Sequence, residues 1–235
     1  MNAWDHPLIK KGMTAQLATR RARIAAGEAP LGWKVGLGAP ASLEKLRIAA
    51  PAVGFLMQSA LLPSGTTVSL KNYVRPVAEP EIAVRMARDL GGGATAAQAL
   101  AAIDSIRPAI ELADLDPVPA HDNLDVVLAG DIYQRHVLLG DNSRAGAGLE
   151  GIVSRVMRRG VEVNRTGDPE ALTGKMGDIV AHVANTLAAF GEKLSAGDFI
   201  ITGSITPPPM IEPDETSFVH AVDPIGEVRV AFTRD

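Results

Sequence analysis

The stretch Arg75–Val84 reads RPVAEPEIAV and places two glutamates, Glu79 and Glu81, two residues apart in an otherwise apolar run. Short apolar segments bounded by proline are typical of β-strands. Side chains alternate between the two faces of a strand, so Glu79 and Glu81 are expected on one face, with Ile82 and Val84 on the other. The stretch therefore predicts either a strand with a solvated edge or half of a carboxylate site.

A second stretch repeats this arrangement. Residues Ala109–Ala113 read AIELA and predict a strand in which Glu111 lies among small and apolar neighbours. A solvated face is the usual explanation for an isolated Glu-x-Glu. Three buried acids, however, would repel one another unless their pKa values rise or a cation lies between them. We therefore predict that Glu79, Glu81 and Glu111 bind one hard divalent cation, Mg²⁺, Mn²⁺ or Ca²⁺.

The rest of the chain predicts a mixed α/β (α+β) protein. The elements do not alternate regularly, as they would in a doubly wound sheet. Alanine-rich or periodic segments followed by glycine or proline predict helices over residues 14–26, 42–50, 95–103 and 178–190, the third of which must end before Pro108. Strand and turn composition covers residues 52–90, 107–115, 124–140, 160–171, 199–209 and 218–232, with a loop at 116–122. Arg20, Arg21 and Arg23 are expected on a solvated face of the first helix. We expect one catalytic domain over residues 1–235, with a short helical region at about 1–50 and a β-rich core at about 52–235.

Composition excludes several classes of protein. The chain has 235 residues, 46% of them hydrophobic, which is enough for a sizeable core. A net charge of −4 disfavours a nucleic-acid partner. The absence of cysteine excludes disulfides, thiolate metal sites and thiol nucleophiles. No signal peptide and no run of 18 apolar residues is found, so a soluble, cytoplasmic protein without a membrane partner is expected.

The sequence does not contain complete motifs for nucleotide binding or for hydrolysis. Residues Gly36–Ala41, GLGAPA, superficially match a dinucleotide fingerprint, but Pro40 lies within the turn and no acid follows at the distance that ribose binding requires. The chain lacks the G-x-S-x-G, H-E-x-x-H and G-K-[ST] patterns. Its five histidines lie far apart in the sequence, and each is expected to be structural.

In combination, six blocks of sequence resemble the 2-keto-4-pentenoate hydratase and 4-oxalocrotonate decarboxylase group of the fumarylacetoacetate hydrolase superfamily. The blocks are GWKVGLG (32–38), EPEIAV (79–84), AIELAD (109–114), LGDNSRAG (139–146), VAHVANTLAAFGEKLSAGD (180–198) and ITGSITPPP (201–209). The chain departs from the family pattern at Lys175 and Arg144, and its region before Gly32 is shorter than expected. These departures are expected to affect substrate choice or the cover over the site.

The resemblance implies a fumarylacetoacetate-hydrolase-like β-roll with flanking helices, assembled as a homo-oligomer. It implies that Glu79, Glu81 and Glu111 bind the metal, Mg²⁺ or Mn²⁺. It also implies that Lys34 is catalytic, stabilising an enolate oxygen or moving a proton, and that Ser204 binds the substrate carboxylate.

The implied activity is that of a metal-dependent hydratase, a hydro-lyase of aromatic catabolism. It would add water to a 2-hydroxy-2,4-dienoate of the 2-keto-4-pentenoate type and give a 4-hydroxy-2-oxo acid. Two enzymatic alternatives stay open: a 4-oxalocrotonate-type 2-oxo acid decarboxylase, and an acylpyruvate C–C hydrolase in which His6 would activate water. A non-catalytic partner subunit of a decarboxylase or hydratase complex is the alternative outside enzymes. Gly203-Ser204 favours the hydratase, because the decarboxylases tend to have Gly-Gly there.

Overall fold

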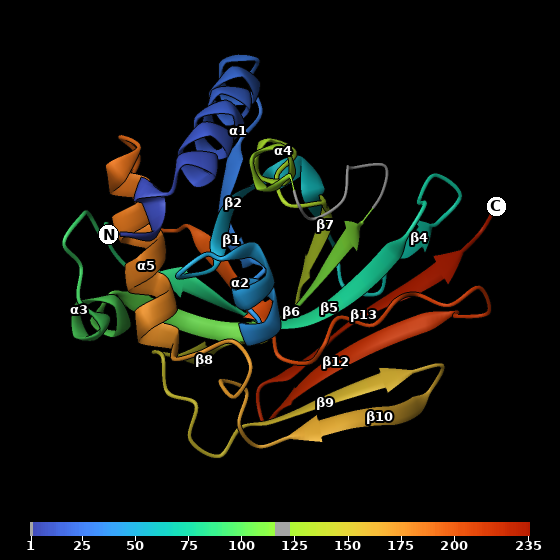
Figure 1. Cartoon of the computed structure of the whole chain (residues 1–235). Helices are drawn as coiled ribbons and strands as arrows, with labels where there is room; N and C mark the ends of the chain where they lie inside the picture. Colours follow the sequence, from blue (N-terminus) through green and yellow to red (C-terminus); the bar gives the residue numbers. More distant parts are fainter. Residues whose placement is uncertain (1, 116–122) are drawn as a thin grey trace.

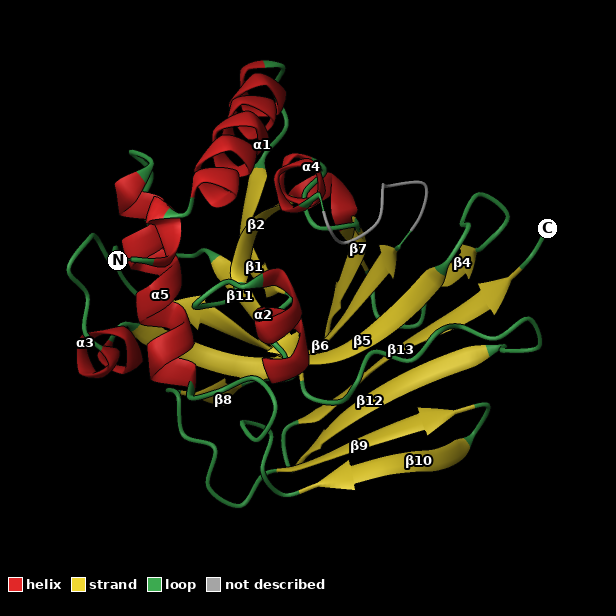
Figure 2. Ribbon diagram, viewed as in Figure 1, coloured by secondary structure: helices red, strands yellow, loops and turns green. Residues whose placement is uncertain are grey.

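Two β-sheets and a set of flanking helices make up the protein (Figures 1 and 2). The computed structural model describes residues 2–115 and 123–235. The larger sheet contains β1 (Pro30–Gly36), β2 (Ala52–Met57), β3 (Leu61–Leu62), β5 (Pro76–Met86), β6 (Ile103–Asp114), β7 (Gln134–Leu139), β8 (Arg144–Ala145) and β11 (Phe199–Ser204). Its strand order is β2-β1-β11-β5-β6-β7-β3, with β8 paired to β6.

The second sheet lies below the first in Figure 1 and has the order β10-β9-β12-β13-β4. Its strands are β4 (Thr67–Ser69), β9 (Val153–Arg158), β10 (Val161–Thr166), β12 (Ser217–Asp223) and β13 (Gly226–Thr233). The helices are α1 (Pro7–Ala25), α2 (Pro40–Leu46), α3 (Ala96–Ala101), α4 (Leu124–Ala129) and α5 (Met176–Ala189), with short 3₁₀ turns at Ala3–Asp5 and Gln58–Ala60. These mixed sheets with flanking helices confirm the predicted fold class.

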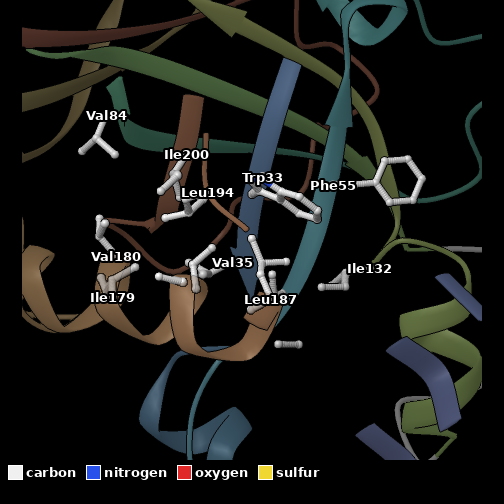
Figure 3. Close-up of a cluster of buried hydrophobic side chains, with 14 of the residues drawn as sticks. Trp33, Val35, Phe55, Val84, Ile132, Ile179, Val180, Leu187, Leu194 and Ile200 are labelled. Atoms are coloured by element: carbon white, nitrogen blue, oxygen red, sulfur yellow. The ribbon is translucent and has the colours of Figure 1, made fainter. Parts of the chain in front are cut away.

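One face of the larger sheet packs against helix α5. Apolar side chains of β1, β11 and β5 form one buried cluster with this helix (Figure 3); they include Trp33, Val35, Ile200 and Val84, and the helix contributes Ile179, Val180 and Leu187. Burying a side chain of this size stabilises the fold by about 1.5–3 kcal/mol. Since side chains alternate along a strand, Lys34 lies on the other face of β1, between Trp33 and Val35.

The second sheet covers a further part of that same apolar face. Ala78, Ile110 and Leu112 form one buried cluster with Phe218 and Val230 of the second sheet. Both apolar surfaces involve the even-numbered residues of β5 and β6, so the odd-numbered residues, which include the three acids, lie on the opposite face.

Residues 124–129 form helix α4, so the strand predicted from Leu124 is wrong for this segment; β7 begins only at Gln134. Valines favour strands locally, but α4 packs on α1 where Gly12 leaves room, since a Cβ there would lie 2.5 Å from Leu128 Cβ. Gln16 Nε2 also donates to the Leu128 carbonyl at 2.8 Å. Tertiary packing therefore overrides local propensity here.

Arg20 was expected on a solvated face and is instead buried. Its guanidinium carbon lies 4.3 Å from the centroid of the Trp33 ring, and its Nη1 lies 3.5 Å from Glu192 Oε2. The prediction holds for Arg21, which is exposed, whereas Arg23 is half-buried. Contact with an aromatic face and with a carboxylate offsets the desolvation free energy of this buried guanidinium.

Other boundaries shift. Helix α1 begins at Pro7, before the expected start, and α5 begins at Met176 rather than at Asp178. The region before residue 50 also contains β1, an internal strand that lies second from one edge of the larger sheet. The loop predicted at 116–122 lies outside the described residues. Of the helices that are described, none combines the length and apolar character needed to cross a bilayer.

Candidate active site

The three predicted acids converge on one face of β5 and β6. Glu79 and Glu111 are register partners on these antiparallel strands, and Glu81 lies two residues further along β5, opposite Ala109. One carboxylate oxygen from each of the three acids lies within 4.8 Å of the others. The structure therefore brings together the residues that alternation in the two strands predicted.

The triad is buried and one of its oxygens has no partner. Glu81 and Glu111 are fully buried, and Glu79 is half-buried. Glu81 Oε2 accepts a hydrogen bond from the Gly203 N–H at 2.7 Å, but Glu81 Oε1 has no hydrogen-bond partner among the described residues. A buried carboxylate oxygen without a donor is costly. The all-oxygen donor set and this unpartnered oxygen fit a hard divalent cation.

Lys34 is buried beside the triad. Register pairs place it next to Gly54 on β2 and Ile201 on β11. Its ammonium donates to the Glu111 carboxylate and, at 3.1 Å, to the carbonyl of Ile132. The predicted catalytic lysine therefore lies at the site, held by an acid of the triad and by a backbone carbonyl.

All four groups of this cluster have raised pKa values, because three buried acids surround a single lysine. Burial and the charge of Glu111 raise the pKa of Glu79 to about 7. Burial and the neighbouring acids raise the pKa of Glu81 well above its usual range, and burial also raises that of Glu111. Burial alone would lower the pKa of Lys34, but the carboxylates around it, Glu111 first, outweigh burial and raise it. A divalent cation among the acids would favour their ionised forms.

A pocket of about 270 Å³ opens above the triad. Its charged side chains are Lys34, Glu79 and Glu111, and its neutral polar ones are Ser42, Tyr133, Thr173, Thr202 and Ser204. Its remaining wall is largely apolar and includes Val35, Leu37, Pro51, Val77, Leu115, Ile132, Leu172, Pro208 and Met210. Among the residues described, Lys34 is the single cationic side chain that lines it.

Ser204, the predicted contact for a substrate carboxylate, also lines this pocket. Its hydroxyl donates to the Thr206 carbonyl at 2.7 Å, so the hydroxyl must turn away from that carbonyl before it can donate to a ligand. The two departures from the family pattern lie elsewhere. Lys175 flanks α5 and pairs with Glu170 at 2.7 Å, and Arg144 donates to the Glu150 carbonyl; neither lines the pocket.

Asp131 is a buried acid close to Lys34 to which the sequence pattern assigns no role. It lies behind Lys34, where its Oδ1 accepts the Phe55 N–H at 2.8 Å, and burial raises its pKa to about 8. The sequence alone does not single it out, because a lone aspartate in a turn has no pattern that distinguishes it from a solvated one.

The fold and this site are those of an enzyme: a buried acid triad and a lysine lie at the base of a largely apolar pocket. The model of the fumarylacetoacetate (FAA) hydrolase C-terminal family matches residues 33–233. The chain belongs to the fumarylacetoacetate hydrolase family, as its sequence blocks predicted.

Relatives of this chain include both decarboxylases and hydratases. It is 31% identical to a 4-oxalocrotonate decarboxylase of Pseudomonas sp. strain CF600 over 207 residues, which cover 87% of this chain and 78% of the relative. It is 29% identical to a 2-hydroxyhexa-2,4-dienoate hydratase of Comamonas testosteroni over 241 residues, 97% of this chain and 89% of the relative. Sequence identity does not separate the two reactions.

Among solved structures, the chain is similar to a 4-oxalocrotonate decarboxylase from Pseudomonas putida G7 complexed with magnesium and adipate. The TM-score is 0.86 at 26% identity, over 96% of this chain and 86% of that one. A second structure of that decarboxylase is complexed with calcium and acetate, with a TM-score of 0.84 at 27% identity. Such metal-bound relatives support a divalent metal in this family.

Proposed function

We propose that this chain is a divalent-metal-dependent hydratase of aromatic catabolism, which adds water to a 2-hydroxy-2,4-dienoate and yields a 4-hydroxy-2-oxo acid. One observation carries the choice of substrate: among the described residues, the pocket wall beyond the triad and Lys34 offers no cation for a second carboxylate. A monocarboxylate with an uncharged tail suits this pocket, because an unpaired carboxylate against apolar side chains is costly.

Glu79, Glu81 and Glu111 would hold the cation, with Mg²⁺ or Mn²⁺ as the candidates. When bound, the cation would supply Lewis-acid polarisation of the carboxylate and 2-oxygen of the substrate. The three carboxylates are held rigidly, since paired strands fix their backbones and the Gly203 N–H orients the Glu81 carboxylate.

Lys34 would hold a proton at Nζ beside the 2-oxygen, which gains negative charge as the dienol is deprotonated. The reaction then needs a proton at C5 of the dienoate, the oxygen of water at C4 and a proton at C3, so one water is consumed in total. The apolar wall, with Leu37, Leu172 and Met210, would keep other water away from the tail.

Decarboxylation of a 4-oxalocrotonate-type acid is the second candidate, and the similarity to the Pseudomonas putida decarboxylase favours it. That substrate carries a second carboxylate. The C–C hydrolase is less well supported, because His6, its candidate water activator, lies at the start of α1 and does not line the pocket.

Two substrates distinguish these functions. With Mg²⁺ or Mn²⁺, the enzyme is expected to remove the ultraviolet absorbance of 2-hydroxypenta-2,4-dienoate without releasing carbon dioxide, and to leave 4-oxalocrotonate largely unchanged. Carbon dioxide released from 4-oxalocrotonate at a comparable rate would contradict the hydratase and favour the decarboxylase. Metal binding without turnover of either acid would instead favour the non-catalytic partner subunit.

Variants connect this activity to the site. Glu79→Gln and Lys34→Ala are each expected to lower kcat by about a hundredfold or more. Glu150→Gln is the matched control, since the Glu150 side chain is 88% exposed and lies outside the pocket. Full activity in Glu79→Gln would contradict the metal assignment.

A further inference from the structure

The turn that follows helix α4 has an unusual backbone. Asp131, Ile132 and Tyr133 are consecutive and have φ angles of 58°, 51° and 64°. Left-handed backbone is unfavourable for residues other than glycine, most of all for a β-branched residue such as Ile132. Three such residues in a row persist only where the surroundings hold them, and this occurs most often at functional sites.

The turn presents a backbone carbonyl to the catalytic lysine. The Ile132 carbonyl accepts a hydrogen bond from Lys34 Nζ at 3.1 Å, while the Glu111 carboxylate accepts another. An ammonium has three N–H donors. With two donors taken by these acceptors, the direction of the third is fixed, and Lys34 lines the pocket.

The side chain of Asp131 anchors this turn to the neighbouring strand. Its Oδ1 accepts the N–H of Phe55, on β2, at 2.8 Å. The anchor is therefore next to Gly54, the register partner of Lys34. One hydrogen bond ties together the strand beside the lysine and the turn that binds its ammonium.

Two glycines leave the space that the turn occupies. A Cβ at Gly54 would lie 2.8 Å from Asp131 Oδ1 and 2.8 Å from Lys34 Cγ. A Cβ at Gly36 would lie 2.9 Å from Ile132 Cγ2. All three distances are shorter than real Cβ contacts, so β1 and β2 are both shaped around this turn.

We propose that Asp131 is a positioning residue for Lys34: its carboxylate holds the left-handed turn on β2, so that the Ile132 carbonyl fixes the ammonium of Lys34 toward the substrate. The inference rests on the proposed role of Lys34 in catalysis. What Asp131 supplies is a hydrogen-bond acceptor for the Phe55 N–H at a left-handed position, and not a charge.

Two substitutions of Asp131 distinguish the effect of its acceptor oxygen from the effects of its charge and of its left-handed backbone. Asp131→Asn keeps an acceptor oxygen and suits left-handed backbone, but removes the charge. Asp131→Gly also permits left-handed backbone but removes the acceptor. We expect Asp131→Gly to lower kcat about 10–100-fold with KM within about threefold, since small misplacements of a reacting group have effects of this size. Asp131→Asn is expected to keep kcat within about threefold.

A measurement without turnover tests the same inference. In protein with ¹⁵N-labelled lysine, the buried Lys34 ammonium is expected to give a slowly exchanging signal, assigned by its loss in Lys34→Met. That signal is expected to keep its shift in Asp131→Asn and to move or broaden in Asp131→Gly. Asp141→Ala, at an exposed aspartate, is the control.

The outcomes are distinct. Wild-type kcat and an unchanged Lys34 signal in Asp131→Gly would overturn the proposal. Equal losses in Asp131→Asn and Asp131→Gly would also overturn it, because the charge would then be the property that matters. If the wild-type protein turns over no dienoate, the proposed function fails, and the Lys34 signal still decides whether Asp131 positions the ammonium.

Discussion

Glu79 and Glu111 face each other directly across the β5–β6 pair, as register partners whose carboxylates both point into the site. Like charges directly opposite on antiparallel strands are destabilising. Lys34 offsets only part of this repulsion, because its ammonium pairs with Glu111. The two glutamates therefore differ in what their removal does to the protein.

Glu79→Gln is expected to stabilise the metal-free protein. It removes a repulsive charge, so the free energy of unfolding should rise by about 1 kcal/mol, which corresponds to a Tm increase of roughly 2–4 °C. Calorimetry should show at least tenfold weaker binding of Mg²⁺ by the same variant. A fall in metal-free Tm, with Glu150→Gln unchanged as control, would contradict this prediction.

Glu111→Gln is expected to act in the opposite direction. It leaves the buried ammonium of Lys34 without its paired carboxylate, and loss of one partner from a buried ion pair costs about 3 kcal/mol or more. The metal-free Tm should fall by roughly 6–12 °C. Pairing this change with Lys34→Met, which removes the unpaired cation, should recover part of the loss. A fall no larger in Glu111→Gln than in Glu150→Gln would mean that this pair contributes little.

Stability of the metal-free protein is expected to fall as the pH rises from 6 to 9. The pKa values of Glu79, about 7, and Asp131, about 8, lie above their ordinary values of 4.5 and 3.8. The folded protein thus binds these protons more tightly than the unfolded chain does, and this contribution is lost as the pH rises through 7 and 8. Thermal unfolding at several pH values measures the effect, and Glu79→Gln should reduce it.

Saturating Mg²⁺ should also weaken that loss, since the cation replaces the protons. Burial lowers the pKa of His220 to about 4, so its contribution is present above pH 6.5 and is lost as the pH falls through 4. Above pH 6.5 the contribution of His220 is complete and only the loss from the two acids remains, so the Tm of the metal-free protein is expected to fall between pH 6.5 and 8. A metal-free Tm that rises steadily to pH 9 would contradict the raised pKa values.

Ser204→Ala is expected to raise KM about tenfold, because a hydrogen bond to a charged group contributes about 1.5–3 kcal/mol. Little change in kcat is expected, since the hydroxyl would bind the carboxylate and not the reacting carbons. Steady-state kinetics on 2-hydroxypenta-2,4-dienoate measures both constants. An unchanged KM would mean that the hydroxyl serves only its hydrogen bond to the Thr206 carbonyl.

Gly36→Ala is expected to lower both kcat and stability. Its Cβ would lie 2.9 Å from Ile132 Cγ2 and would push the turn that binds Lys34, with a loss of stability of about 1–3 kcal/mol. Gly167→Ala is the control, because its Cβ would meet no atom within 4 Å and its backbone is not left-handed. If Gly36→Ala and Gly167→Ala have the same kcat and stability, the structure accommodates the added Cβ at Gly36 without displacing the turn.

The acid triad could be predicted from the sequence because it depends on one rule. Alternation in two strands places Glu79, Glu81 and Glu111 on matching faces, and pairing of those strands does the rest. Asp131 could not be found in this way, because its role depends on contacts with Phe55 and Lys34, far away in the sequence. Helix α4 was missed for a similar reason: its packing on α1 outweighs its valines. Homo-oligomeric assembly stays a prediction.

Strand β11 lies between β1 and β5 in the sheet but follows both in the sequence, so the strands are not synthesised in the order in which they lie in the sheet. A ribosome makes β1 and β5 long before β11, so a nascent chain that ends before Phe199 has a gap in the middle of its larger sheet. Such a chain would leave two strand edges open to other chains, and open edges promote aggregation. Truncated products should therefore be both inactive and poorly soluble, and the enzyme depends on translation reaching its last strands.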